Sequence, residues 1–181
     1  VQKIKFMETG EESEKTYTRE RVMKETTAYL ITNILFNVTP STATVYGTQI
    51  ATKTGTSSYP DDMLREYGLS TNVIRDSWVA TYNPEYTITF WYAYDKFDPE
   101  YVNYMSNATS NRNQIQGLLT KNIMNTGSSF TMPKGITSSK VEFGTIPARL
   151  PSEYTPADLI ETHLFISGTE PTEVSNRYSG L

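Results

Sequence analysis

Two strand-like runs on either side of a short turn are the feature that most constrains the fold of this chain. The runs cover residues 78–82 and 86–94, are rich in aromatic and β-branched residues, and are joined by Asn-Pro-Glu at 83–85, a combination typical of a hairpin. A third β-branched stretch, residues 45–56, precedes them. Three consecutive strands with short links predict an antiparallel sheet, and residues 57–75 are expected to be a polar connection.

Two further segments have the apolar periodicity of amphipathic helices. Apolar side chains recur every three or four positions in residues 21–38 and again in residues 111–127. We expect Pro40 to end the first helix and Gly127 to cap the second, which packs on the sheet. The side chains predicted to form the two apolar stripes are Met23, Thr27, Leu30, Ile31, Ile34, Leu35, Val38, Ile115, Leu118, Leu119 and Ile123.

The two ends of the chain complete the predicted architecture. Residues 1–17 are expected to form a hairpin around a turn that contains Gly10. We interpret these residues as the start of a piece cut from a longer chain. Five of the nine prolines lie in the last fifty residues. The fold class expected is therefore α/β (α+β), an antiparallel sheet flanked by helices over residues 1–130, followed by a proline-rich C-terminal extension over residues 131–181.

The composition excludes several kinds of site. The chain has no cysteine and one histidine, His163, so thiol chemistry and a zinc site are not expected. Its net charge of −4 argues against a nucleic-acid partner. The sequence has no long apolar run, so we expect neither a membrane anchor nor a signal peptide in it. No metal or organic cofactor is predicted, and a nucleophile or base has to be Ser, Thr, Lys, Tyr or a carboxylate.

The strongest candidate for a binding site is the run Lys53-Thr54-Gly55-Thr56. An extended strand places Lys53 and Gly55 on one face and the two threonines on the other. The run offers an ammonium, two hydroxyls and backbone N–H groups, and Gly55 lets a ligand backbone come close. A peptide that ends in a carboxylate suits such a strand edge.

Two alternatives remain open for the same run. The run also fits a threonine-rich edge strand without a ligand, in which the lysine protects the edge against aggregation. Residues 47–54 come within one residue of the phosphate-loop pattern, from which they depart at Thr52. The single histidine, His163, is interpreted as a structural residue rather than a general base.

The motif and its surroundings resemble the transpeptidase domain of the class A (bimodular) penicillin-binding proteins. Lys-Thr-Gly-Thr is the third motif of penicillin-binding proteins and serine β-lactamases. Three more stretches are similar to segments of that family and occur in the same order: "VMKETTAYLITNIL", "DSWVATYNPEYTITFWYAYD" and "HLFISGTEPTEVSN". The chain departs from the family at Thr52 and Ala93, where glycine is usual or frequent, and in the longer link 57–75, which leaves the shape of the cleft entrance open.

The resemblance implies the sheet-bearing part of a β-lactamase/transpeptidase-like domain that lacks most of the all-helical half. No serine stands three residues before any lysine, so the nucleophile motif Ser-x-x-Lys is absent and is expected on a separate upstream fragment. Ser70-Thr71-Asn72 matches the second motif, Ser-x-Asn, but it follows Lys53 and is interpreted as a coincidence. With that half missing, Trp78, Phe90, Trp91 and Leu118 are expected to be left poorly covered.

The resemblance also implies the roles of the site residues. Lys53 supplies positive charge and assists proton movement, Thr54 and Thr56 bind the substrate carboxylate, Gly55 lies against the substrate, and the Thr56 N–H contributes to the oxyanion hole. The implied activity is peptidoglycan D,D-transpeptidation by serine acyl transfer, with acylation by β-lactams, at the extracytoplasmic face of the bacterial membrane.

The partners implied by the resemblance are the N-terminal fragment of the same protein, peptidoglycan stem peptides and β-lactams. Membrane contact is expected only through a region absent from this chain. The alternative function is a non-catalytic cell-wall binding or scaffolding module with the same fold.

Overall fold

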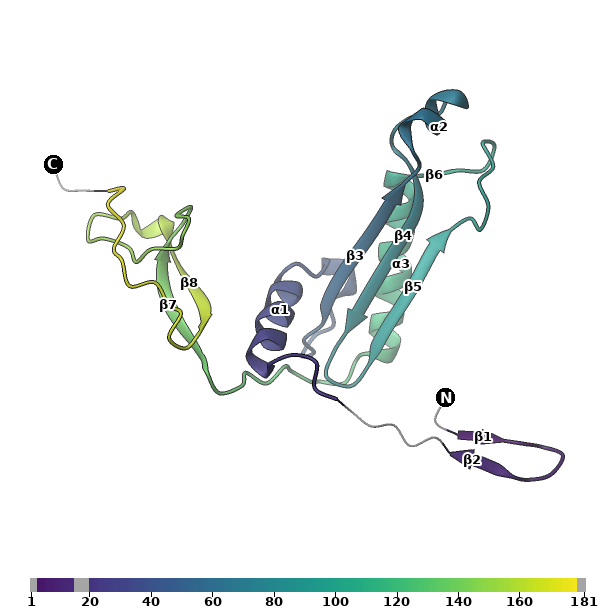
Figure 1. Ribbon diagram of the computed structural model, residues 1–181, viewed down its shortest axis with the longest axis horizontal. Helices are drawn as coiled ribbons and strands as arrows, with labels where there is room; N and C mark the ends of the chain where they lie inside the picture. Colours follow the sequence, from purple (N-terminus) through teal and green to yellow (C-terminus); the bar gives the residue numbers. More distant parts are fainter. Residues whose placement is uncertain (1–2, 15–19, 179–181) are drawn as a thin grey trace.

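The computed structural model describes residues 3–14 and 20–178, which form a central antiparallel sheet, two helices on that sheet and two smaller two-stranded sheets (Figure 1). The elements in chain order are β1 (Lys3–Lys5), β2 (Glu12–Glu14), α1 (Glu25–Asn37), η1 (Ser41–Ala43), β3 (Ala51–Ser58), α2 (Asp61–Glu66), β4 (Val73–Tyr82), β5 (Thr87–Ala93), β6 (Asn103–Tyr104), α3 (Met105–Ile123), β7 (Ile136–Glu142), η2 (Ala157–Leu159) and β8 (Ile160–Ile166).

The central sheet has the order β3-β4-β5, and every pair in it is antiparallel, as predicted. The turn between β4 and β5 is closed by Asn83, whose N–H donates to the Tyr86 carbonyl at 2.9 Å. Its side-chain Oδ1 accepts from the N–H groups of Glu85 and Tyr86 at 2.9 and 2.7 Å. The asparagine therefore supplies the hydrogen bonds of the turn locally, which is why the hairpin can be predicted from the sequence.

The link over residues 57–75 is more structured than predicted. It contains α2, which begins directly after Pro60, carries Asp61 and Asp62 in its first turn and buries Leu64. β3 begins at Ala51 rather than at residue 45, and β4 begins at Val73, where it also pairs with β6. Strand β4 is thus the longest strand and the centre of the sheet.

Helix α3 packs on the sheet through a face that the sequence analysis did not predict. The buried residues of the helix are Ala108, Arg112, Gln116, Gly117 and Thr120. Gln116 donates to the Thr52 hydroxyl at 3.0 Å and Arg112 donates to the Ser77 hydroxyl at 3.2 Å. Because this face of the sheet presents hydroxyl groups, polar side chains of α3 match it better than leucine and isoleucine would.

The predicted apolar stripe of α3 is therefore largely exposed to solvent. Leu118 is 65% exposed, and Ile115 and Ile123 are also exposed. The helix ends at Ile123, so Gly127 does not cap it but lies four residues beyond its end, where its φ is +70°. The predicted helix is confirmed, and Leu118 is poorly covered as expected, whereas the prediction that this stripe faces the sheet and the predicted cap are wrong.

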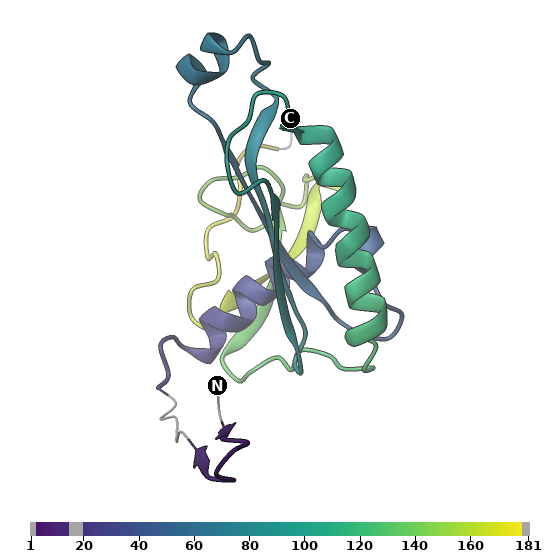
Figure 2. The same cartoon turned by 90° about the vertical axis from the view of Figure 1, so that its right-hand side faces the viewer.

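Helix α1 lies on the opposite side of the sheet from α3, as Figure 2 shows. Its Thr32 hydroxyl is 2.9 Å from the Tyr82 hydroxyl, and Thr39, just beyond its end, donates to the Ile50 carbonyl at 2.8 Å. The helix ends three residues before Pro40, as predicted. Much of its predicted stripe is nevertheless exposed: Met23, Ile31, Ile34 and Val38.

The hairpin at the start of the chain is formed by β1 and β2, in register from Lys3 opposite Glu14 to Lys5 opposite Glu12. Gly10 has a φ of +71° and donates its N–H to the Phe6 carbonyl at 2.8 Å. This part of the predicted hairpin is confirmed. Its last residues, 15–17, lie outside the described residues.

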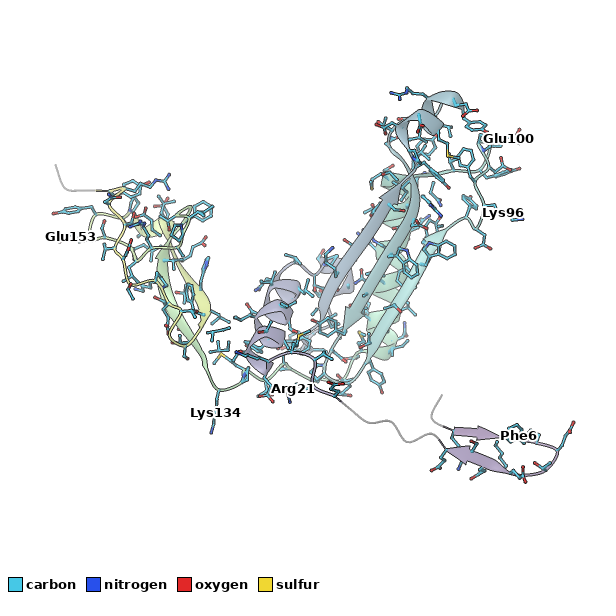
Figure 3. All side chains as sticks on the ribbon, viewed as in Figure 1. Phe6, Arg21, Lys96, Glu100, Lys134 and Glu153 are labelled. Carbon is cyan, nitrogen blue, oxygen red and sulfur yellow. The ribbon has the colours of Figure 1, made fainter. Side chains whose placement is uncertain are left out.

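Residues 136–166 contain a second folded unit that the sequence analysis did not predict. β7 and β8 pair along their whole length, from Ile136 opposite Ile166 to Glu142 opposite Ile160. Figure 1 shows this unit on the far side of α1 from the central sheet. Figure 3 labels Lys134, which lies just before β7 in the linker formed by residues 124–135. In the described part of the chain, no helix is long and apolar enough to cross a membrane.

The buried side chain of Glu142 is hydrogen-bonded to two other segments of the β7–β8 unit. It is 1% exposed and accepts from the Thr155 hydroxyl at 2.6 Å and from the Ser175 hydroxyl at 2.8 Å. The Glu142 N–H donates to the Arg149 carbonyl at 2.9 Å. One side chain at the end of β7 therefore connects the strand to the loop before η2 and to the segment after β8.

Gly117 of α3 lies close against the backbone of η1, and replacing it with alanine is expected to destabilise the protein. The added Cβ would lie 2.6 Å from the Thr42 carbonyl oxygen, a backbone atom that cannot rotate away. Overpacking of this kind costs about 1–3 kcal/mol, which outweighs the gain of about 1 kcal/mol in helix propensity. The midpoint of thermal unfolding should fall. Gly55→Ala is the matched control, because its Cβ would lie 3.5 Å from the Trp78 Cβ and should leave the midpoint unchanged; equal midpoints for both variants would contradict the packing.

Candidate functional site

The run Lys53-Thr54-Gly55-Thr56 lies in the middle of β3, which pairs with β4 and with no other strand of the described residues. Lys53 is opposite Ala80 and Gly55 is opposite Trp78, on the face of the sheet that points away from α3. The side chains of Thr54 and Thr56 point to the α3 side. The run is therefore an edge strand that presents its ammonium and its two hydroxyls on opposite faces.

The environment of Lys53 and Gly55 is open. Both residues are exposed, and the Lys53 ammonium donates to the neighbouring Thr54 carbonyl. A Cβ placed on Gly55 would lie 3.5 Å from the Trp78 Cβ, which is an ordinary van der Waals contact. Thr54 is half-buried and Thr56 is exposed. A ligand that lies along the free edge of β3 can be reached by side chains from both faces of the strand.

Two tryptophans form an exposed aromatic surface beside this run. Trp78 and Trp91 are directly opposite on β4 and β5, with ring centroids 6.0 Å apart and planes inclined by 28°. Trp78 is 50% exposed and Trp91 is 40% exposed. Together with Leu118 on the other face, they confirm the expectation of poorly covered apolar residues, whereas Phe90 is half-buried. Soluble monomers rarely leave such adjacent large apolar side chains uncovered.

Asp76 links the three strands at the end of this surface. Its Oδ1 accepts from the Trp91 indole at 2.9 Å, and its Oδ2 accepts from the Ser57 hydroxyl. The hydrogen bond from Ser57 is the main reason why the pKa of Asp76 lies below its ordinary value, and it outweighs partial burial, which raises the pKa. The bond from Trp91 and the nearby Arg75, whose Nε is 3.7 Å from Oδ2, lower the pKa further. Asp76 is therefore ionised at neutral pH.

The structure places Thr52 in the interior, between β3 and α3. Thr52 is 2% exposed, faces α3, and has its hydroxyl 2.9 Å from the Thr81 hydroxyl and 3.0 Å from the Gln116 amide nitrogen. This departure from the family pattern thus alters the contact between β3 and α3 and leaves the face that carries Lys53 as it is. Ala93, the second departure, lies opposite Asp76 at the end of β5.

Replacing Thr52 with valine is expected to lower the free energy of unfolding by about 1–3 kcal/mol, because the buried Gln116 amide loses its acceptor. Urea unfolding measures the difference. Thr89→Val, on the exposed surface of β5, is the control and should stay within about 0.5 kcal/mol of the parent. Equal stability of Thr52→Val and the parent would show that the bond contributes nothing.

The structure does not support the other candidate motifs. Ser70-Thr71-Asn72 lies in an exposed turn between the end of β3 at Ser58 and the start of β4. Ser58 is already about 17 Å along the strand from Lys53. A phosphate loop would open a helix after Lys53 and Thr54, yet both residues lie inside β3. His163 is exposed on β8, with its Nε2 2.8 Å from Glu161 Oε2.

The cluster of Ser57, Asp76 and Trp91 is the part of the site that the sequence analysis missed. The three residues come from three strands and are up to 34 positions apart in the chain. Only the strand register brings them together, and the signal available in the sequence was the Asp-x-Trp segment that starts at Asp76.

Comparison with known proteins gives matches to one family. Residues 132–180 match the family model for the penicillin-binding protein 1A C-terminal domain. The chain is 29% identical to penicillin-binding protein 1A/1B of Bacillus subtilis over 98% of its own length, and 26% identical to penicillin-binding protein 1A of Clostridium tetani over 93%. It is also 33% identical to penicillin-binding protein 1A of Streptococcus oralis over 52% of its length.

The chain spans only about a fifth of the length of the first two relatives. The alignments with these two relatives nevertheless run through the central sheet, α3 and the β7–β8 unit, and the family model covers that last unit separately. Residues 132–180 thus match the C-terminal domain of penicillin-binding protein 1A, and the chain as a whole is similar to a part of penicillin-binding proteins 1A and 1A/1B.

Proposed function

We propose that this chain supplies the Lys-Thr-Gly-Thr strand of a peptidoglycan D,D-transpeptidase whose nucleophilic serine lies on an upstream part of the same protein. The observation that carries the proposal is the position of Lys53 and Gly55 on an edge strand, on an open face beside the exposed pair Trp78 and Trp91. A strand with a free edge and a cation suits a peptide that ends in a carboxylate.

In the proposed reaction the serine hydroxyl attacks the carbonyl of the penultimate D-alanine of a stem peptide. The peptide bond breaks, the terminal D-alanine leaves with the proton, and an acyl-serine ester forms. An amine from a neighbouring strand then attacks the ester, forms the cross-link and releases the serine. A β-lactam acylates the same serine when its ring amide opens, and no metal or organic cofactor takes part.

The residues of this chain bind and polarise the substrate in that scheme. Lys53 attracts the terminal carboxylate and assists proton transfer, and the hydroxyls of Thr54 and Thr56 donate to the carboxylate. Gly55 lets the substrate backbone lie close to β3. The Thr56 N–H is one of two oxyanion-hole donors. In other enzymes, removing one such donor costs about 3–4 kcal/mol of transition-state stabilisation.

We further propose that the upstream fragment covers the open face of the sheet. The exposed side chains of Trp78 and Trp91 lie there, and α1 presents the exposed Ile31 and Ile34. In this arrangement residues 1–130 are the sheet-bearing part of the transpeptidase domain and residues 131–181 form a separate C-terminal unit. The assembled enzyme acts at the extracytoplasmic face of the membrane, which it contacts only through a region outside this chain.

Labelling with a fluorescent penicillin tests the proposal. The full-length protein that contains this chain should form a covalent adduct that survives denaturation, whereas the isolated 181-residue chain should form none. An unlabelled full-length protein would reject the transpeptidase and would favour the alternative, a non-catalytic cell-wall binding module. Labelling of the isolated chain would place the nucleophile within residues 1–181 and would also reject the proposal.

A further inference from the structure

The carboxylate of Asp76 connects β3 to β5 across β4. Asp76 is directly opposite Ser57 on β3, and it is diagonal to Trp91 on β5, because Ala93 is its direct partner there. The Oδ2 atom accepts a hydrogen bond from the Ser57 hydroxyl, and Oδ1 accepts one from the Trp91 indole N–H at 2.9 Å. The side chain is 22% exposed, so the bonds are partly shielded from water. We call this arrangement the Asp76 clamp.

The clamp lies directly beside an irregularity in the sheet. The register shifts between Ser57, which is opposite Asp76, and Ser58, which is opposite Ile74. Arg75 is therefore the extra residue of a β-bulge on β4. A bulge bends its strand and re-aims the neighbouring side chains, so the position of the strand depends on what holds the residues around it. The clamp fixes both strands on the side of the bulge that carries Thr56.

We infer that Asp76 is a positioning residue, which holds the end of the Lys-Thr-Gly-Thr strand and the Trp91 ring in the geometry needed for acyl transfer. Ser57 directly follows Thr56, whose N–H and hydroxyl have roles in the proposed function. The inference rests on that proposed function and assigns a role to three residues outside the motif. Asp76 touches no substrate in this scheme and acts through Ser57 on β3 and through Trp91 on β5.

The ionised state of Asp76 suits this task. A carboxylate only accepts hydrogen bonds, so both neighbours have to donate and neither bond can reverse. Hydrogen bonds to an ionised group are also shorter and stronger than bonds between neutral groups. The geometry around Ser57 is therefore set more firmly than a hydroxyl pair would set it.

Acylation kinetics in the full-length protein test the inference. Asp76→Ala and Ser57→Ala should each lower the acylation rate constant at saturating penicillin by about 10- to 100-fold, because small misplacements of a reacting group have effects of that size. The double variant should be no slower than the slower single variant, since both changes open the same clamp. Asp76→Asn, which keeps an acceptor for Trp91 and a partner for Ser57, should recover most of the rate.

The matched control is Ser58→Ala, the exposed serine on the other side of the register shift, which should react at the parental rate. Parental rates in Asp76→Ala, fully multiplicative losses in the double variant, or an Asp76→Asn variant as slow as Asp76→Ala would each overturn the inference. A loss that appears only as a smaller fraction of reactive protein, with the rate constant unchanged, would show a purely structural role and overturn it as well.

Hydrogen exchange separates a failure of this inference from a failure of the proposed function. Amides of residues 51–58 should exchange faster in Asp76→Ala than in the parent, whether or not the protein reacts with penicillin. If the parent is not acylated, the proposed function fails, and the exchange of β3 alone decides whether the clamp exists. Equal exchange in parent and Asp76→Ala would show that Asp76 does not hold this strand.

Discussion

Replacing Lys53 with alanine in the full-length protein is expected to lower the rate of penicillin acylation by about 100- to 1000-fold and to leave the midpoint of thermal unfolding unchanged. The rate should fall because, in the proposed function, the variant loses the cation that attracts the carboxylate and assists proton transfer, and each of these effects is of this order in other enzymes. Stability should be retained because Lys53 is exposed and its ammonium donates to the adjacent Thr54 carbonyl, not to a distant part of the fold. Stopped-flow acylation with a chromogenic β-lactam gives the rate, and scanning calorimetry gives the midpoint.

Lys140→Ala is the matched control for this experiment. Lys140 is also an exposed lysine on a strand, but it lies on β7, in the unit beyond the linker. It should be acylated at the parental rate. Acylation of Lys53→Ala at the parental rate would remove Lys53 from the site, and an equal loss in both variants would point to a general effect of charge.

Replacing Glu142 with leucine is expected to unfold the β7–β8 unit locally while the central sheet stays intact. Leucine has a similar size but leaves the buried hydroxyls of Thr155 and Ser175 without their acceptor. Each unsatisfied buried group costs about 1–3 kcal/mol, so the unit loses about 2–6 kcal/mol. Amides of residues 136–166 should then exchange at least about 30-fold faster in hydrogen-exchange mass spectrometry, because 1.36 kcal/mol corresponds to a factor of ten.

Glu142→Gln is the conservative comparison, since an amide can still accept from one hydroxyl and donate to the other. Its exchange should lie much nearer to that of the parent. Residues 51–58 and 73–82 provide the internal control and should exchange equally in all three proteins. Unchanged exchange over residues 136–166 in Glu142→Leu would show that the carboxylate does not hold this unit together.

The central sheet and the position of the Lys-Thr-Gly-Thr run were predictable because short-range features determine them. The turn at Asn83 is closed by hydrogen bonds within four residues, and the period-two pattern of the flanking strands specifies their pairing. The two faces of β3 follow directly from the same alternation. Local sequence was therefore sufficient to place Lys53 and Gly55 on one face and the two threonines on the other.

The buried face of α3 was not predictable because the surface it packs on is polar. Periodicity assumes that the apolar stripe of a helix is the buried one, and here Gln116 and Arg112 are buried against hydroxyl groups while Leu118 is exposed. The hydroxyls come from residues far away in the chain, Thr52 and Ser77.

The Asp76 clamp and the β7–β8 unit were missed for a related reason. The clamp needs the register of three strands and a bulge, none of which a single segment of sequence specifies. In residues 131–181 the prolines indicated an extended chain, but they lie outside β7 and β8. Glu142 would be read as a surface residue from the sequence, whereas its partners Thr155 and Ser175 make it part of the interior.

Mapping the penicillin adduct in the full-length protein tests the central claim most directly, namely that this chain presents Lys53 and Thr56 to a nucleophile supplied from elsewhere. The protein is labelled with penicillin and digested, and the modified peptide is sequenced by mass spectrometry. The adduct should lie on the serine of a Ser-x-x-Lys motif outside residues 1–181, and Lys53→Ala should greatly reduce its yield at short reaction times. An adduct on any residue of this chain would contradict the claim.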